Sequence, residues 1–218
     1  MIFASVLSAQ PALQPVRFTV FSAKPVANLA FAPRMGAPPQ KVVFYPTARS
    51  PRYEFRTAMP IRFIDTETGS IVAEANIPPE IRQALLLFSA IAPAPAEPTG
   101  SRPTSGLRYQ VAVLDDSTAS HGAGGLAIIN LSGLALSGTV GTQAFTLQAG
   151  LNAPIPVGRS AKIALRTTAN KRSYQSYAET LQLTGKQRAL LILFPPFYKG
   201  SLEVQSRLLV DEVAPAPR

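Results

Sequence analysis

The 218-residue chain contains no cysteine, no tryptophan and a single histidine, His121. Without cysteine it can form no disulfide, no thiolate metal site and no cysteine nucleophile. A zinc site needs several histidine, cysteine or carboxylate ligands at regular spacing, which one histidine alone does not supply. We therefore expect neither a metal nor a cofactor.

Charged residues are also scarce, at 15% against roughly 25% in an average soluble domain. The apolar fraction is 46% and the mean hydropathy is +0.14, a balance that excludes global disorder. Long apolar runs are missing too. The best stretch, 84–96, is interrupted by Pro93 and Pro95 and falls short of the roughly 18 residues that cross a bilayer. We expect no membrane span.

What the chain has in quantity is turn residues, with 21 prolines and 14 glycines at short intervals. Proline fixes φ and removes a backbone donor, so this spacing suits short strands better than long helices. Apolar and polar residues alternate, as in strands, in several segments: 16–21, 52–56, 61–64, 71–75, 109–113, 162–166 and 202–205.

Two apolar runs, 85–88 and 190–194, lack this alternation and indicate central strands that are covered on both faces. Upstream of the first run, Ile81, Ala84, Leu85 and Phe88 have helical spacing. We expect a single helical turn at 79–82 that leads into the strand.

Three segments of the first half resemble segments of the second half in the same order. Residues 82–88 (RQALLLF) resemble 187–193 (QRALLIL), 18–22 (FTVFS) resemble 128–132 (IINLS), and 109–116 (YQVAVLDD) resemble 202–212 (LEVQSRLLVDE). In both halves the last segment ends in two acids. This order predicts an internal duplication.

The sequence therefore predicts an all-β protein of two tandem immunoglobulin-like β-sandwich units related by internal duplication. The first unit spans 15–117 and carries a Pro/Ala-rich loop at 92–106, the second spans 123–213, and 214–218 form a tail. We expect residues 1–14 to be a remnant of a signal segment or a disordered tail, because 1–9 (MIFASVLSA) are apolar and end in small residues but lack a basic start. We expect an extracytoplasmic location, in the periplasm, on the cell surface or secreted.

Catalytic patterns are weak. Ser117 or Ser120, His121 and Asp115 or Asp116 supply the residue types of a triad, but neighbours on one glycine-rich loop do not easily adopt its geometry. Asp115 and Asp116, with Asp65 or Glu67, could bind Ca²⁺, although acids that end a strand and bind turn amides are the favoured interpretation. We expect no enzyme.

The net charge of +9 divides into +3 for residues 1–117 (eleven Lys/Arg, eight Asp/Glu) and +6 for 118–218 (ten and four). Such an excess can recruit nucleic acid, acidic glycan or anionic lipid, or simply keep the surface soluble. The candidate ligand-binding group for a polyanion is Arg49, Arg52, Arg56 and Arg62, with a solvated strand face as the alternative. A second basic and aromatic group comprises Lys171, Arg172, Tyr174 and Tyr177.

Residues 113–117 (VLDDS), Gly124-Gly125 and 129–133 (INLSG) resemble uncharacterised bacterial exported proteins with tandem β-sandwich units. The resemblance covers about a tenth of the chain and implies a bacterial, extracytoplasmic setting without assigning site residues.

The leading hypothesis is a non-enzymatic exported structural or binding module, whose partner is another envelope or extracellular protein or an acidic polysaccharide. The alternatives are a module that binds a polyanion, either acidic polysaccharide or nucleic acid, through the arginine group, and a hydrolase that uses carboxylates alone.

Overall fold

The computed structural model describes residues 15–91 and 106–213. Over these two ranges the chain forms strands and turns and no helix, so the predicted all-β fold is confirmed. It follows that the described ranges hold no helix of the length and apolar character that crossing a bilayer requires. The predicted segments 1–14 and 214–218, and the loop at 92–106 except for Gly106, lie outside the described residues.

Eight strands form two sheets that we call the first unit. One sheet has the order β4-β1-β7-β8 and the other β3-β2-β5-β6. Their bounds are β1 (Val16–Ser22), β2 (Leu29–Phe31), β3 (Gln40–Lys41), β4 (Tyr53–Phe55), β5 (Ile61–Asp65), β6 (Ile71–Ala75), β7 (Gln83–Ala90) and β8 (Tyr109–Asp115).

Nine strands form the second unit, again in two sheets. One has the order β12-β9-β16-β17, with β13 also paired to β9, and the other β11-β10-β14-β15. Their bounds are β9 (Gly125–Asn130), β10 (Leu136–Val140), β11 (Gln143–Leu147), β12 (Gly150–Leu151), β13 (Ile155–Pro156), β14 (Ser160–Ala169), β15 (Arg172–Gln182), β16 (Gln187–Phe194) and β17 (Gln205–Glu212).

The segments that resemble each other in sequence occupy corresponding places in the two units. In the first unit β1 runs parallel to β7, which pairs antiparallel with β8. In the second unit β9 runs parallel to β16, which pairs antiparallel with β17. The immunoglobulin-like classification and the duplication itself stay predictions.

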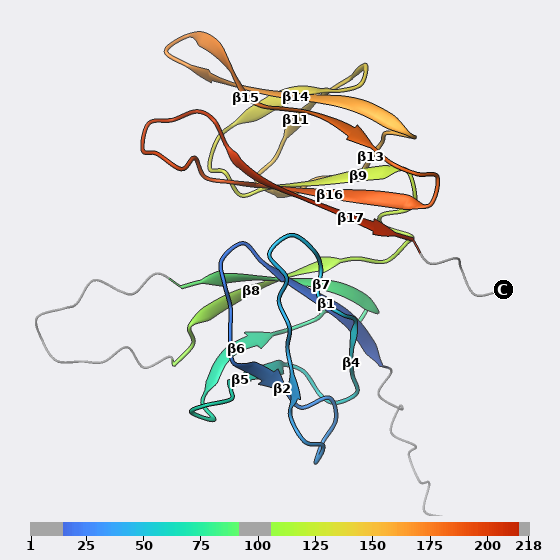
Figure 1. The fold of residues 1–218 in the computed structure, drawn as a ribbon, viewed down its shortest axis with the longest axis vertical. Coiled ribbons are helices and arrows are strands. Elements are labelled where there is room, and N and C mark those ends of the chain that lie inside the picture. The colour runs from blue at the N-terminus through green and yellow to red at the C-terminus, as the bar shows by residue number, and fades with distance from the viewer. Residues whose placement is uncertain (1–14, 92–105, 214–218) are drawn as a thin grey trace, which may run out of the picture.

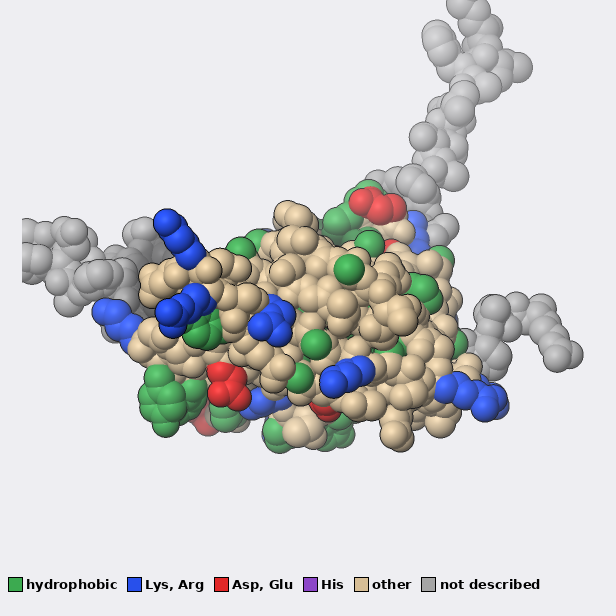
Figure 2. Space-filling view, turned by 90° about the horizontal axis from the view of Figure 1, so that it is seen from above, with side chains coloured by type: hydrophobic (Ala, Val, Ile, Leu, Met, Phe, Trp, Pro, Cys, Tyr) green, Lys and Arg blue, Asp and Glu red, His purple; other side chains and the backbone are tan. Residues whose placement is uncertain are grey.

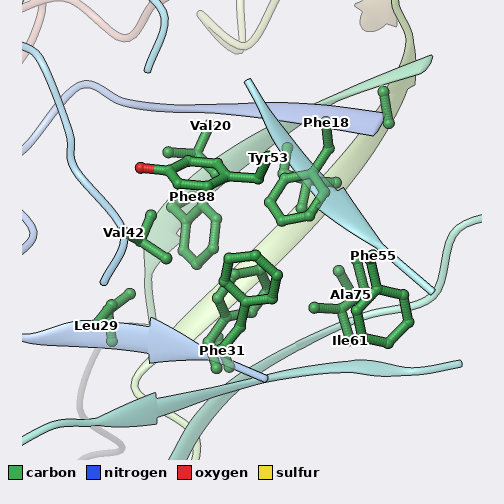
Figure 3. Close-up of a cluster of buried hydrophobic side chains, with 14 of the residues drawn as sticks. Phe18, Val20, Leu29, Phe31, Val42, Tyr53, Phe55, Ile61, Ala75 and Phe88 are labelled. Carbon is green, nitrogen blue, oxygen red and sulfur yellow. The ribbon is translucent and has the colours of Figure 1, made fainter. Parts of the chain in front are cut away.

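Each unit has its own apolar core between its two sheets. The first is rich in aromatic rings, which come from β1, β2, β4, β5 and β7 (Figure 3). Phe18 and Phe31 contact edge to face with ring centroids 5.1 Å apart, and Phe63 and Phe88 do so at 5.0 Å. The second core is aliphatic, built around Leu126, Ile163, Leu165 and Leu191. Burial of such side chains supplies most of the drive for folding.

A third apolar core joins the two units. Successive side chains of β7 and β16 point to opposite faces of their sheets. Leu86 and Leu191 therefore enter the cores of their own units. The third core takes the side chains on the other face: Leu85, Leu87, Leu190 and Ile192. The molecule is thus a stack of four sheets, with β4-β1-β7-β8 and β12-β9-β16-β17 facing each other in the middle (Figure 1). The prediction that the two apolar runs are covered on both faces is confirmed.

Two local predictions need correction. In place of the helical turn expected at 79–82, residues 78–81 form a turn closed by the Ile81 N–H, which donates to the Pro78 carbonyl at 3.0 Å. The strand expected at 202–205 begins only at Gln205, because Pro195 and Pro196 at the end of β16 open a longer loop.

Candidate functional site

Two arginines and two aspartates form a buried ion cluster at the seam, by which we mean the contact between the two central sheets. Arg49 precedes β4, Asp116 follows β8, Arg188 lies on β16 and Asp211 on β17, so each unit contributes one residue of either sign. Asp116 accepts from Arg49 and lies 3.2 Å from Arg188 Nη2. Asp211 lies 2.9 Å from Arg188 Nε and 3.1 Å from Arg49 Nε.

The four side chains balance one another in charge, and the two arginines are buried whereas Asp116 and Asp211 are partly buried. Arg188 is 6% exposed and Arg49 is 8% exposed. Arg188 Nη1 also donates to the carbonyls of Asp116 at 3.1 Å and His121 at 3.0 Å. The contact of Arg49 Nε with Asp211 is an ion pair without a hydrogen bond. The cluster therefore holds the two units in one register.

His121 is buried beside this cluster. Its Nε2 lies 3.1 Å from the Gly125 carbonyl, which can only accept, so Nε2 carries the proton and donates. Burial lowers the pKa of His121 below 6.5, and the nearby positive charges of Arg188 and Arg49 lower it further. The imidazole is therefore neutral in the folded protein at neutral pH.

This neutral histidine makes stability depend on pH. Because the unfolded chain binds a proton near pH 6.5 and the folded chain binds it only at lower pH, the free energy of unfolding should fall as the pH drops below 6.5. The loss at pH 5.5 is at most about 1.4 kcal/mol, the equivalent of one pKa unit. Urea unfolding at pH 7.5 and 5.5 should show a smaller difference for His121→Gln than for the natural protein. Equal differences would contradict this assignment.

The residues of the conceivable triad do not assemble into one. Ser120 Oγ donates to Asp115, Ser117 Oγ lies 3.3 Å from Ser120 Oγ, and His121 is engaged by Gly125. Burial alone would raise the pKa of Asp115, but hydrogen bonds from Ser120 and Ser117 outweigh it and hold this pKa below its usual value. These residues are the end of a strand and its turn, the arrangement favoured from the sequence.

The conceivable calcium ligands are also engaged in local structure. Asp65 accepts from the amides of Glu67 and Thr68 and pairs with Arg108. Asp116 is held by the two arginines of the ion cluster. Across residues 15–91 and 106–213, no three Asp, Glu or His side chains gather as a metal ion would require.

A small cavity of about 230 Å³ opens at the seam. Its wall is mainly apolar, from Leu85, Leu114, Leu190 and their neighbours, with Asp115 and Asp116 at one side. Ligand pockets for small molecules usually measure roughly 300–1,000 Å³. We attribute this cavity to incomplete contact between two twisted sheets.

The four arginines singled out from the sequence do not lie together. Arg49 is buried in the ion cluster at the seam. Arg62, on β5, is exposed and pairs with Glu74 of β6 across the hairpin at 3.1 Å. Arg52 and Arg56 flank β4 and line one hollow, whereas Tyr53 and Phe55 between them are buried in the core.

This hollow, which we call the basic hollow, has a volume of about 510 Å³ and lies between β4 and the β2–β3 loop. The Arg56 N–H donates to the Pro33 carbonyl at 2.9 Å and so ties the loop to the strand. A turn closed by the Ala37 N–H and the Arg34 carbonyl, with Gly36 at φ +71°, brings Arg34 to the same hollow.

Three arginines therefore share the basic hollow with a single acid, Glu54, which pairs with Arg56 and, at 3.9 Å, with Arg17. Within the described ranges, no ion pair involves Arg34 or Arg52. Sequence reasoning missed Arg34, which lies 18 residues before Arg52. The signal that could have found it is the MGAPP turn that follows Arg34.

No protein-family model matches this chain, and no curated protein matches it either. Its function is therefore argued from the geometry of these sites.

Proposed function

We propose that this chain is a non-enzymatic, extracytoplasmic binding module that binds an acidic polysaccharide in the basic hollow. The observation that carries the proposal is the convergence of Arg34, Arg52 and Arg56 on one hollow with a single acid. Guanidinium groups present several donors in a plane, which suits the carboxylate and sulfate groups of such polymers. The low share of charged residues, 15%, and the many turns between short strands support the extracytoplasmic location.

Polysaccharide is favoured over nucleic acid because the basic hollow offers no platform for bases. Single-stranded nucleic acid is bound largely by stacking on exposed aromatic rings. The aromatic residue that lines the hollow is Tyr53, which is buried and whose hydroxyl accepts from the Val43 N–H at 2.8 Å. Burial raises the pKa of Tyr53, so its hydroxyl stays neutral and adds no repulsion to an anion.

The test is retention on immobilised heparin, a sulfated polysaccharide, over a series of salt concentrations. The triple variant R34A/R52A/R56A should bind at least about tenfold more weakly than the natural protein, because charge-assisted hydrogen bonds are lost. The matched control R159A/K162A/K186A removes the same charge from exposed positions of the second unit. It should elute close to the natural protein.

Two results would count against the proposal. Equal elution of the two triple variants would mean that only total charge governs retention. Stronger competition by single-stranded DNA than by free heparin would point to nucleic acid as the ligand.

A further inference from the structure

The loop between β16 and β17 projects two adjacent aromatic side chains into solvent. Phe197 is 74% exposed and Tyr198 is 71% exposed, and their rings contact edge to face with centroids 4.9 Å apart. Pro195 and Pro196 precede them and restrict the backbone. A turn closed by the Ser201 N–H and the Tyr198 carbonyl at 3.1 Å, with Gly200 at φ +86°, follows them. The loop therefore presents the rings on a constrained backbone.

Basic side chains lie on the same loop and on the hairpin that is bonded to it. Lys199 occupies the same turn. The β14–β15 hairpin projects from the same end of the second unit in Figure 1, and the Val204 N–H donates to the Ser176 carbonyl at 3.1 Å, linking the loop to β15. Asn170 and Lys171 form the tip of this hairpin, both with positive φ, in the two-residue turn that suits the strand twist.

We call Phe197, Tyr198, Lys199, Lys171 and Arg172 the aromatic tip. Across the described residues, no ion pair engages its three cations. Glu203 is the acid in the β16–β17 loop. Seen from above, several Lys and Arg side chains lie toward this end of the molecule, at the left of the view, and others lie toward the opposite end (Figure 2). Residues 118–218 also carry the larger charge excess, with ten Lys/Arg against four Asp/Glu.

We propose that the aromatic tip docks the protein on a lipid bilayer that contains anionic lipid. Exposed aromatic rings at a protein's edge are suited to the headgroup region, where one side of the ring is apolar and the other wet. Basic residues around them are attracted to anionic headgroups. A soluble polyanion would bind the cations but would not bury the two exposed aromatic rings. A bilayer with anionic lipid would do both, so it is the favoured partner. This site is separate from the basic hollow and belongs to the other unit.

The absence of tryptophan from the chain allows a direct test. Phe197→Trp introduces the only tryptophan, and its fluorescence should shift to the blue with vesicles in which about a third of the lipid is phosphatidylglycerol. Met35→Trp is the matched control, because Met35 is 89% exposed on the turn that carries Arg34 at the basic hollow. We expect no shift for Met35→Trp and a much smaller shift for Phe197→Trp with neutral phosphatidylcholine vesicles.

Vesicle co-sedimentation measures the affinity itself. The double variant F197S/Y198S should partition roughly ten- to a hundredfold more weakly than the natural protein, because two rings lose their burial. R34A/R52A/R56A should co-sediment with the vesicles as the natural protein does, even if it no longer binds heparin. The heparin assay therefore tests the basic hollow, and the vesicle assay tests the aromatic tip.

Three results would overturn the inference: a blue shift of Met35→Trp in place of Phe197→Trp, an equal shift with neutral vesicles, or a shift with dextran sulfate but not with vesicles. The last two would show, respectively, that charge is not recognised and that the partner is a soluble polymer.

Discussion

Replacing Arg188 by alanine is expected to lower the free energy of unfolding by about 3–5 kcal/mol. Arg188 lies between Asp116 and Asp211 and donates to two backbone carbonyls of the loop after β8. Removal of the guanidinium leaves two partly buried carboxylates, 14% and 27% exposed, with Arg49 as their remaining partner. It also leaves the carbonyls of Asp116 and His121 without this donor. Loss of one member of a buried ion cluster costs more than loss of a whole pair, because the remaining charges stay away from water.

Urea unfolding measures this effect, with the midpoint compared at an unchanged slope. Arg62→Ala is the control, because Arg62 also pairs with an acid but is exposed, and such pairs contribute about 0–1 kcal/mol. Arg188→Lys should recover part of the loss, since an ammonium keeps the charge but cannot donate in the same plane to both aspartates. If Arg188→Ala and Arg62→Ala unfold at the same urea concentration, the cluster does not stabilise the seam.

The strand pattern could be predicted from the sequence because alternation and turn residues act locally. The segments 16–21, 61–64 and 71–75 lie within β1, β5 and β6, and the polar loop ending in Gly69 joins the last two as a hairpin. The same local signal failed at 202–205, where two prolines and the turn at Gly200 delay the strand.

The stacking of the two units could not be predicted in this way. The apolar runs 85–88 and 190–194 indicate strands buried on both faces, but any layer can bury the second face. The sequence reasoning assumed that each half folds around its own interior, whereas Leu85, Leu87, Leu190 and Ile192 form a third core between the halves. The contact between the two central sheets is made by residues about one hundred positions apart. The spacing of apolar residues along the chain does not predict such long-range contacts.

Arg49 shows the same limit for a candidate site residue. The sequence predicts that it lies with Arg52, Arg56 and Arg62, because arginines near one another in sequence can share a strand face. Instead it pairs with Asp116, which follows β8, and with Asp211, near the end of β17. The repeated acids at the end of both halves were visible in the sequence. The fold brings one acid from each half to the seam, where the two carboxylates need cations as partners. The repeated acids therefore point to Arg49 and Arg188, but only once the fold is known.

Gly138→Ala is expected to destabilise the second unit by about 3 kcal/mol or more, at the upper end of what overpacking costs. Gly138 lies on β10 opposite Leu165 of β14, where β14 and β15 shift register between Leu165 and Arg166. A Cβ at Gly138 would lie 2.0 Å from the Ala164 carbonyl oxygen and 2.9 Å from its carbon. Because the obstacle is backbone, no change of rotamer can relieve it, and β10 must move away from β14.

Gly185→Ala provides the matched control, since nothing lies within 4 Å of the added carbon and the residue lies in an open turn before β16. Thermal unfolding of both variants measures the difference, and hydrogen exchange locates it. Amides of β10 and β14 should exchange faster in Gly138→Ala, whereas those of β1 and β7 should change less because they lie in the first unit. The absence of a side chain at Gly138 lets β10 lie this close to β14. Equal melting temperatures for the two variants would show that this close approach does not stabilise the second unit.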